Sequence, residues 1–183
     1  MPQFARHLAD VAQASSIRYN NLVYDMKRQG HDVIVLSLGE AFFDIPLHSM
    51  DDLPFPEIYH YSHSRGLPEL RERLAQHYET SYGVAVDVER ELIVTAGSKI
   101  GIHMALMTIL DPGDEVVICE PAWVSYSEQV KLCHGVPVMV PYSVPTGELD
   151  RYLSSRTKAI IINNPNNPSG VVLREKELRH IYD

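Results

Sequence analysis

The sequence predicts an α/β protein whose mostly parallel sheet carries helices on both of its faces. Two observations support this fold class. First, short apolar runs of strand length alternate with helical patterns through the second half of the 183-residue chain. Second, these runs are nearly continuous in Val, Ile and Leu, which is typical of parallel strands buried on both faces. Open sheets of this kind bind ligands beyond the carboxyl ends of their strands, so functional residues are expected there.

The individual elements follow from composition and spacing. Strands are expected at five apolar, β-branched runs, over residues 33–38, 92–95, 115–118, 137–140 and 159–162. Apolar residues at helical spacing predict one or two helices over 4–28, then helices over 68–82, 98–110, 123–134 and 174–182. Pro68 suits a first helical position, and three glycines suit positions just after helix ends: Gly30, Gly83 and Gly135.

Charge and cysteine content argue against several classes of function. The formal net charge is -8 and the chain has no run of Lys and Arg, which argues against binding to the phosphate backbone of nucleic acids. Cys119 and Cys133 form neither a CxxC motif nor a disulfide framework, so reduced thiols in the cytoplasm are expected. No signal-peptide pattern and no apolar stretch of membrane-spanning length occurs. A cytoplasmic protein without a membrane partner is therefore expected.

Metal binding and hydrolase chemistry are not expected either. His60 and His63 lie near Glu57, but no fourth ligand stands at a recognised spacing, so turn or surface histidines explain them. His103 falls within the helix expected over 98–110, where a packed or partly exposed side chain explains it. The Gly-x-Ser-x-Gly elbow of many hydrolases is absent from the sequence.

The first strand end that could carry chemistry reads Thr95-Ala96-Gly97-Ser98-Lys99 and runs from a strand into a helix. The first amides of a helix have no intrahelical acceptor, and the helix dipole adds partial positive charge, so this turn could hold a phosphate. A Gly-Ser pair at a helix start also serves as an ordinary N-cap, and this alternative stays open. The turn matches neither the P-loop nor the GxGxxG fingerprint.

Two further strand ends carry groups suited to a planar ligand. Trp123, the one tryptophan of the chain, follows the strand over 115–118 and could stack on a flat ring or be a half-buried core aromatic. An asparagine-rich run over residues 163–170 follows the strand over 159–162. Its amides can bond a ligand's ring oxygen or the backbone of their own turn. A phosphate cradle, a stacking ring and an amide donor at three strand ends together indicate a ligand site.

With these residues in view, the chain resembles the pyridoxal-phosphate (PLP)-dependent aminotransferases of fold type I, in the class I/II branch that includes bacterial aspartate aminotransferases. Six motifs carry the resemblance in order: Ser37-Leu38-Gly39-Glu40, Tyr61 to Arg71, Thr95 to Lys99, Leu110 to Val116, Pro121 to Tyr126 and Asn163 to Gly170. They cover nearly the whole chain and are highly specific in combination. The resemblance implies an enzyme that uses PLP to move an amino group between an amino acid and a 2-oxo acid.

The resemblance implies a role for each residue of the proposed cofactor site. In the family, the turn that matches Gly97, Ser98 and Lys99 holds the cofactor phosphate through its amides and hydroxyl. Lys99 would support the phosphate electrostatically or be a solvated lysine. Trp123 matches the aromatic ring that stacks on the pyridine, and Asn167 matches the residue that hydrogen-bonds the phenolic oxygen of the cofactor.

Two more residues take roles from the resemblance. Gly39 matches the loop glycine whose backbone contacts the substrate carboxylate. Tyr61 matches the tyrosine that reaches the cofactor phosphate of the neighbouring subunit, which implies a homodimer with shared sites. A plain surface or core tyrosine remains the alternative for Tyr61.

The resemblance also implies a domain organisation and a limit to the chemistry. Residues 1–45 would form N-terminal helices and a segment of the small domain, and residues 46–183 the first half of the PLP-binding large domain, which is incomplete. The rest of the family's sequence supplies the Asp on the pyridine nitrogen, the Schiff-base Lys and the Arg that grips the substrate carboxylate. None of the lysines here stands in that Schiff-base context: Lys27, Lys99, Lys131, Lys158 and Lys176. No catalytic residue is therefore assigned within the chain, which by itself is expected to be inactive.

Two other interpretations of the whole chain stay open. Another fold type I PLP enzyme, such as a β-lyase or a protein like aminocyclopropane-carboxylate synthase, would share the same cofactor cradle. A non-catalytic, truncated binding protein built on the same fold is the second alternative.

Overall fold

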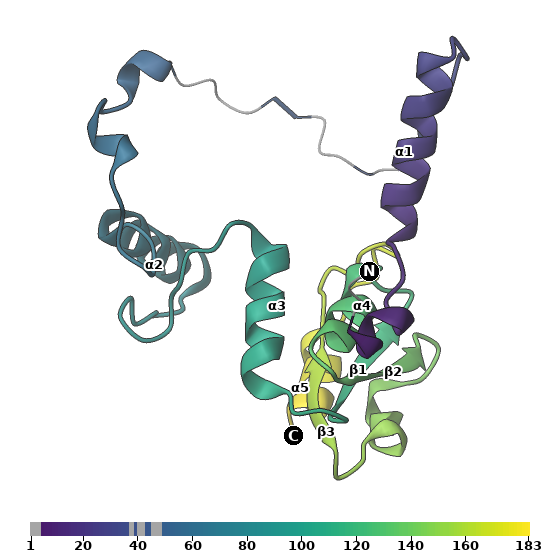
Figure 1. Cartoon of the computed structure of the whole chain (residues 1–183). Coiled ribbons are helices and arrows are strands. Elements are labelled where there is room, and N and C mark those ends of the chain that lie inside the picture. The colour runs from purple at the N-terminus through teal and green to yellow at the C-terminus, as the bar shows by residue number, and fades with distance from the viewer. Residues whose placement is uncertain (1–4, 37–38, 40–42, 45–48) are drawn as a thin grey trace. The chain divides into compact units, whose positions relative to one another are not determined.

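The computed structural model describes residues 5–36, 39, 43–44 and 49–183 (Figure 1). The chain divides into two compact units. Unit 1 comprises Met1–Gly39 and His103–Asp183, and unit 2 comprises Glu40–Ile102. The predicted domain boundary near residue 45 falls outside the described residues and stays a prediction.

A three-stranded parallel sheet is the centre of unit 1. Its strands β1 (Glu115–Glu120), β2 (Val136–Pro141) and β3 (Thr157–Ile161) lie in the order β2-β1-β3, and β1 pairs in parallel with both neighbours (Figure 1). Three of the predicted strands and the parallel arrangement are thereby confirmed. All three carboxyl ends lie at one edge of the sheet, because the strands are parallel.

One face of the sheet packs on two helical segments that follow the strands. The buried side chains of Val117 and Val140 form a cluster with Leu149 of the 3-10 helix η4 (Thr146–Tyr152). Ile181 of α5 (Glu175–Tyr182) packs against the same cluster. The apolar residues of β1 and β2 are therefore covered on this side by η4 and α5.

The opposite face packs on the helix between β1 and β2. That helix is α4 (Ser125–Leu132), and its Val130 is completely buried. The first segment of the chain, the 3-10 helix η1 (Arg6–Asp10), packs on α4 in turn. Helices therefore cover both faces, as predicted for near-continuous apolar strands.

The remaining helices agree with the predicted spacing. The segment expected to hold one or two helices contains η1 and α1 (Ser15–Arg28). The helix expected over 98–110 is α3 (Ser98–Ile109). In the described part of the chain, no helix is long and apolar enough to cross a bilayer.

Unit 2 contains two short 3-10 helices, η2 (Met50–Asp52) and η3 (Glu57–Tyr59), and the helix α2 (Pro68–Tyr82). Pro68 is the first residue of α2, and Gly83 ends the helix in the left-handed conformation with φ 67°, as the sequence predicts. The buried Arg71 of α2 donates from its guanidinium to Val88 O and to Glu89, which also pairs with Arg65.

Two predicted strands, over 33–38 and 92–95, are not found where the structure describes these residues, which is at 33–36 and 92–95. Ile34 and Leu36 are 88% and 90% exposed, and residues 37–38 lie outside the described residues. Val94 donates its backbone N–H to Arg65 O (2.9 Å), which is an isolated bond and not a ladder. An apolar run becomes a strand only where a second strand pairs with it, and in the described part of the chain neither run has such a partner.

A buried carboxylate fixes the amino-terminal edge of the sheet. Glu115, the first residue of β1, accepts hydrogen bonds from Ser154 Oγ (2.6 Å), Arg156 Nε (3.1 Å) and Thr157 Oγ1 (3.4 Å). The Ser154 hydroxyl and the Arg156 guanidinium hold the pKa of Glu115 below its ordinary value of 4.5. These bonds join the start of β1 to the start of β3.

Acid should therefore weaken unit 1. A carboxyl whose pKa is lowered by folding contributes stability that is present above its unfolded pKa and is lost as the pH falls through the folded pKa. We expect the free energy of unfolding of the chain to fall as the pH drops below about 4.5, and the Glu115→Gln variant to lose less over that range. Urea denaturation from neutral pH downward measures this. The matched control is Glu148→Gln, because Glu148 forms a surface pair with Arg151 (2.9 Å). An acid response of the Glu115→Gln variant equal to that of Glu148→Gln would contradict the assignment.

Candidate functional site

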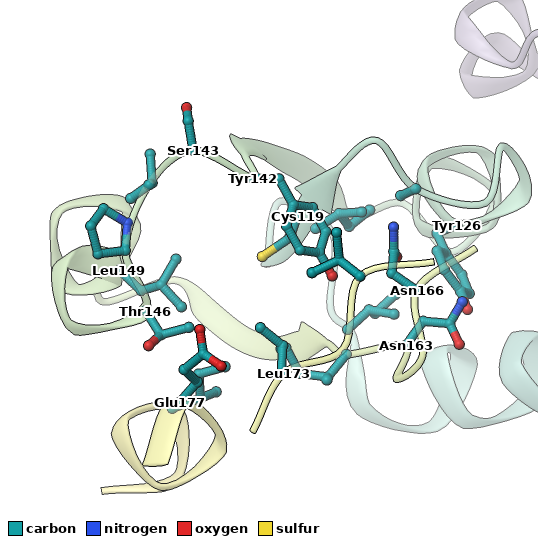
Figure 2. Close-up of a pocket in the computed structure, with 18 residues that line it drawn as sticks. Cys119, Tyr126, Tyr142, Ser143, Thr146, Leu149, Asn163, Asn166, Leu173 and Glu177 are labelled. Atoms are coloured by element: carbon teal, nitrogen blue, oxygen red, sulfur yellow. The ribbon is translucent and has the colours of Figure 1, made fainter. Parts of the chain in front are cut away.

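A cavity of about 160 Å³ lies at the carboxyl ends of β1 and β3 (Figure 2). Its floor is apolar and includes Ile118, Leu149 and Leu173. Polar side chains also line the cavity, among them Cys119, Tyr126, Tyr142, Asn163, Asn166 and Glu177. The structure thus places a cavity at the edge of the sheet where the sequence predicts a ligand.

Burial favours the protonated form of one thiol and two hydroxyl groups of the cavity. It raises the pKa of the Cys119 thiol and of the Tyr126 hydroxyl. Burial also raises the pKa of Tyr142, and the electrostatic effect of the nearby Cys119 and Glu177 groups adds to this. The wall therefore offers S–H and O–H groups that can donate hydrogen bonds, and no activated nucleophile.

The asparagine-rich turn after β3 uses two of its asparagines to hold itself together. Asn164 donates from Nδ2 to Leu173 O (3.0 Å) and accepts the Leu173 N–H at Oδ1 (2.8 Å). Asn166, only 6% exposed, donates from Nδ2 to Ser169 Oγ (2.7 Å) and to Pro121 O (2.9 Å). Asn167 is exposed and takes no part in these bonds. Asn164 and Asn166 therefore stabilise the turn itself, and a ligand-binding role for Asn167 stays a prediction.

The turn between β1 and α4 carries the predicted stacking ring. Trp123 is half-buried, and its ring meets Tyr126 edge-on, with centroids 5.2 Å apart and planes at 83°. The bond from Asn166 to Pro121 O ties this turn to the asparagine-rich turn. The structure therefore brings the turns of Trp123 and Asn167 together at one edge of the sheet.

A second depression adjoins Trp123. It is lined by the N-terminal segment over residues 12–15, by Trp123 itself and by Glu128 of α4. The Ala12 N–H donates to Glu128 Oε2 (2.6 Å), which fixes the N-terminal segment beside the ring. Burial raises the pKa of Glu128, but hydrogen bonds from Lys131 and the Ala12 amide outweigh it and leave the pKa lowered. Glu128 therefore stays ionised and keeps its bond to the segment.

The predicted phosphate turn belongs to unit 2. Gly97 has φ 88°, a conformation that favours glycine, and its carbonyl accepts the Thr95 hydroxyl (2.9 Å). Ser98 is the first residue of α3, and both Ser98 and Lys99 are exposed. The amides of the first turn lack intrahelical acceptors, because the first intrahelical bond is donated by Gly101 to Gly97 O (3.4 Å). This geometry fits an anion.

Tyr61 and Gly39 complete the predicted set. The Tyr61 side chain is fully exposed in unit 2. Gly39, the last residue of the first segment of unit 1, is also exposed. Neither position shows a ligand-binding role by itself. A common site for residues of the two units stays a prediction.

Sequence reasoning missed Asn166 and Tyr126. Both line the cavity and both contact the turn that carries Trp123. The repeated Asn-Pro step was the available signal, but only the family resemblance singled out Asn167, and no sequence pattern indicated a separate role for Asn166. Among the residues that the structure describes, no three His, Cys, Asp or Glu side chains come together in a way that could hold a metal ion.

Comparison with known proteins identifies the family. The model of the aminotransferase class I and II family matches residues 31–183. A probable aspartate/prephenate aminotransferase of Thermus aquaticus is 37% identical over 192 residues, covering 100% of this chain and 50% of that protein. The aspartate aminotransferase of Geobacillus stearothermophilus is 35% identical and covers 97% of this chain and 47% of its own length.

Solved structures agree. An aspartate aminotransferase from Thermus thermophilus with maleate superimposes with a TM-score of 0.88 at 34% identity, covering 99% of this chain and 50% of that one. The chain spans about half the length of the curated relatives it matches. The relatives are named as aminotransferases, so the lyase and non-catalytic alternatives are not favoured. From the family model, the relatives and the shared fold together, the chain belongs to the aminotransferase class I and II family.

Proposed function

We propose that this chain forms the cofactor-binding part of a PLP-dependent aminotransferase that moves an amino group between an amino acid and a 2-oxo acid. The observation that carries the proposal is the match of the family model to residues 31–183, which include each candidate cofactor residue. The structure supports it with a glycine-serine helix start in unit 2 and with the joined turns of Trp123 and Asn167 in unit 1.

The residues present fit the chemical groups of PLP. The first-turn amides of α3 and the Ser98 hydroxyl would hold the phosphate, with Lys99 adding positive charge nearby. The half-buried Trp123 ring would fix the plane of the pyridine. The exposed Asn167 amide would donate to the ring oxygen. When bound, the cofactor supplies an electron-accepting ring that lowers the barrier to removing the α-proton of an amino acid.

The wider assignment follows the family. We place Gly39 against the substrate carboxylate and Tyr61 against the phosphate of a second subunit, which makes the protein a homodimer. The complete exposure of the Tyr61 ring supports a contact outside its own unit. Two cysteines without a disulfide framework, at positions 119 and 133, support a cytoplasmic location.

Binding of PLP to the purified chain tests the proposal. Trp123 is the one tryptophan of the chain, so quenching of its fluorescence on titration with PLP reports contact with the ring that we assign. Saturable quenching is expected. Binding is a better readout than turnover, because none of the five lysines matches the family's catalytic lysine and the chain by itself is expected to be inactive.

Two variants sharpen the test. Asn167→Ala should weaken PLP binding about tenfold, which corresponds to one hydrogen bond to the ligand. Leu178→Ala, on the exposed part of α5, is the matched control and should leave the affinity unchanged. Failure of the chain to bind PLP, or equal affinity of the Asn167→Ala variant and the parent, would count against the proposal.

A further inference from the structure

We propose that Asn166 is a positioning residue that sets the distance and orientation between Trp123 and Asn167. This inference rests on the proposed function for its PLP readout. Asn166 itself would not touch the cofactor. Its side chain would hold two separate turns in register, so that the ring of Trp123 and the amide of Asn167 meet one ligand.

Asn166 is anchored through both its backbone and its side chain. Its backbone N–H donates to Val171 O (2.8 Å), and its carbonyl accepts the Gly170 N–H (2.7 Å). Both protons of Nδ2 are used as well, one by Ser169 Oγ and the other by Pro121 O. The backbone and the side chain are therefore fixed together, and the direction of the neighbouring Asn167 is fixed with them.

The acceptor of the bond between the turns, Pro121 O, lies close to Trp123 in the chain. Pro121 O lies 45 residues away in sequence, on the turn after β1, and Trp123 follows Pro121 by two residues. Two residues of chain span at most about 7 Å, so the bond constrains the turn close to the ring. The Trp123 ring also packs at 83° against the ring of Tyr126, with the centroids 5.2 Å apart.

The two hydrogen bonds of Asn166 Nδ2 have different roles. The bond to Ser169 acts within one turn, whereas the bond to Pro121 joins the two turns. Pro121 is exposed, so water can satisfy its carbonyl when Nδ2 is removed. Loss of the bond between the turns should therefore alter the relative position of Trp123 and Asn167, while the free energy of unfolding of unit 1 changes little.

The experiment is a double-mutant cycle on the purified chain with PLP as the probe. Asn167→Ala should weaken PLP binding about tenfold in the parent but less than about twofold when Asn166 is already Ala, because the amide is then out of register. Asn166→Asp, which keeps the volume but removes the donor to Pro121 O, should behave like Asn166→Ala. Ser169→Ala keeps the bond between the turns and is the matched control, in which the full tenfold effect should remain.

A second readout does not need PLP. Quenching of Trp123 fluorescence by acrylamide should increase in the Asn166 variants and stay at the parent value in Ser169→Ala. If the parent chain does not bind PLP, the proposed function fails, and acrylamide quenching still decides whether Asn166 positions the Trp123 turn. The inference would be overturned if Asn167→Ala weakened PLP binding equally in the parent, the Asn166 variants and Ser169→Ala, and acrylamide quenching stayed unchanged.

Discussion

Gly66→Ala is expected to destabilise unit 2 by about 3 kcal/mol, from the combined cost of an unfavourable φ and an overpacked contact. Gly66 has φ 99°, which L side chains rarely adopt, and a Cβ there would lie 2.6 Å from both Cβ and Cγ2 of Val94. Val94 also donates its backbone N–H to Arg65 O (2.9 Å), so the clash falls beside a hydrogen bond between the two segments. Urea denaturation combined with hydrogen exchange of the α2 amides measures the loss.

A matched control separates the two causes. Gly83 also has a positive φ, 67°, but a Cβ at Gly83 meets no atom within 4 Å. Gly83→Ala should therefore cost about 1 kcal/mol, the backbone part alone. The double variant with Gly66→Ala and Val94→Gly should recover the steric part. Equal effects of Gly66→Ala and Gly83→Ala would show that the contact with Val94 is not close.

The effect extends to the proposed phosphate turn. Gly97 and Ser98 follow Val94 closely in sequence and lie in the same unit. In the part of unit 2 that the structure describes, the buried side chain is the polar Arg71, so the unit has little apolar burial to absorb a clash. Gly66→Ala should therefore also weaken PLP binding, whereas Gly83→Ala should not.

The sheet could be predicted where pairing is available within the chain. The runs that became β1, β2 and β3 are no more apolar than the run over 33–38, whose described residues 33–36 form no strand. Composition indicates whether a segment can be buried, but strand pairing depends on a second segment far away in sequence. For this reason the sequence correctly predicts the order of the helices and of the parallel strands β1 to β3, and wrongly predicts strand structure over 33–36 and 92–95.

The candidate site, like the sheet, could be predicted from the sequence only in part. The sequence predicts a ligand at the carboxyl edge of the sheet, and the structure has a cavity at this edge. The residues alone allow Trp123 to be a stacking ring or a core aromatic, and the structure shows a half-buried ring packed on Tyr126. The resemblance selects Asn167, but the sequence does not reveal the buried contact of Asn166 with Pro121, because that contact joins turns 45 residues apart.

Ile118→Ala is the second substitution with a large expected effect, a loss of about 2–5 kcal/mol from the folding free energy of unit 1. Ile118 is 1% exposed and stands in β1 between Met139 and Ile161 of the neighbouring strands. It lines both the cavity under the asparagine-rich turn and the depression beside Trp123. Truncation at this position removes packing atoms from both hollows. We expect the space to stay unfilled, because Ile118 is held in the middle strand of the sheet.

Variants that remove different numbers of atoms test this expectation. Ile118→Val should cost only about 0.5–1.5 kcal/mol, and Ile34→Ala, at a position 88% exposed, should stay within about 0.5 kcal/mol of the parent. Urea denaturation followed by Trp123 emission reports on unit 1 directly, since Trp123 belongs to it. A loss below about 1 kcal/mol for Ile118→Ala would mean that the two hollows can collapse around the missing atoms. The turns of Trp123 and Asn167 would then be held mainly by the hydrogen bond from Asn166, and its removal should have the larger effect on PLP binding.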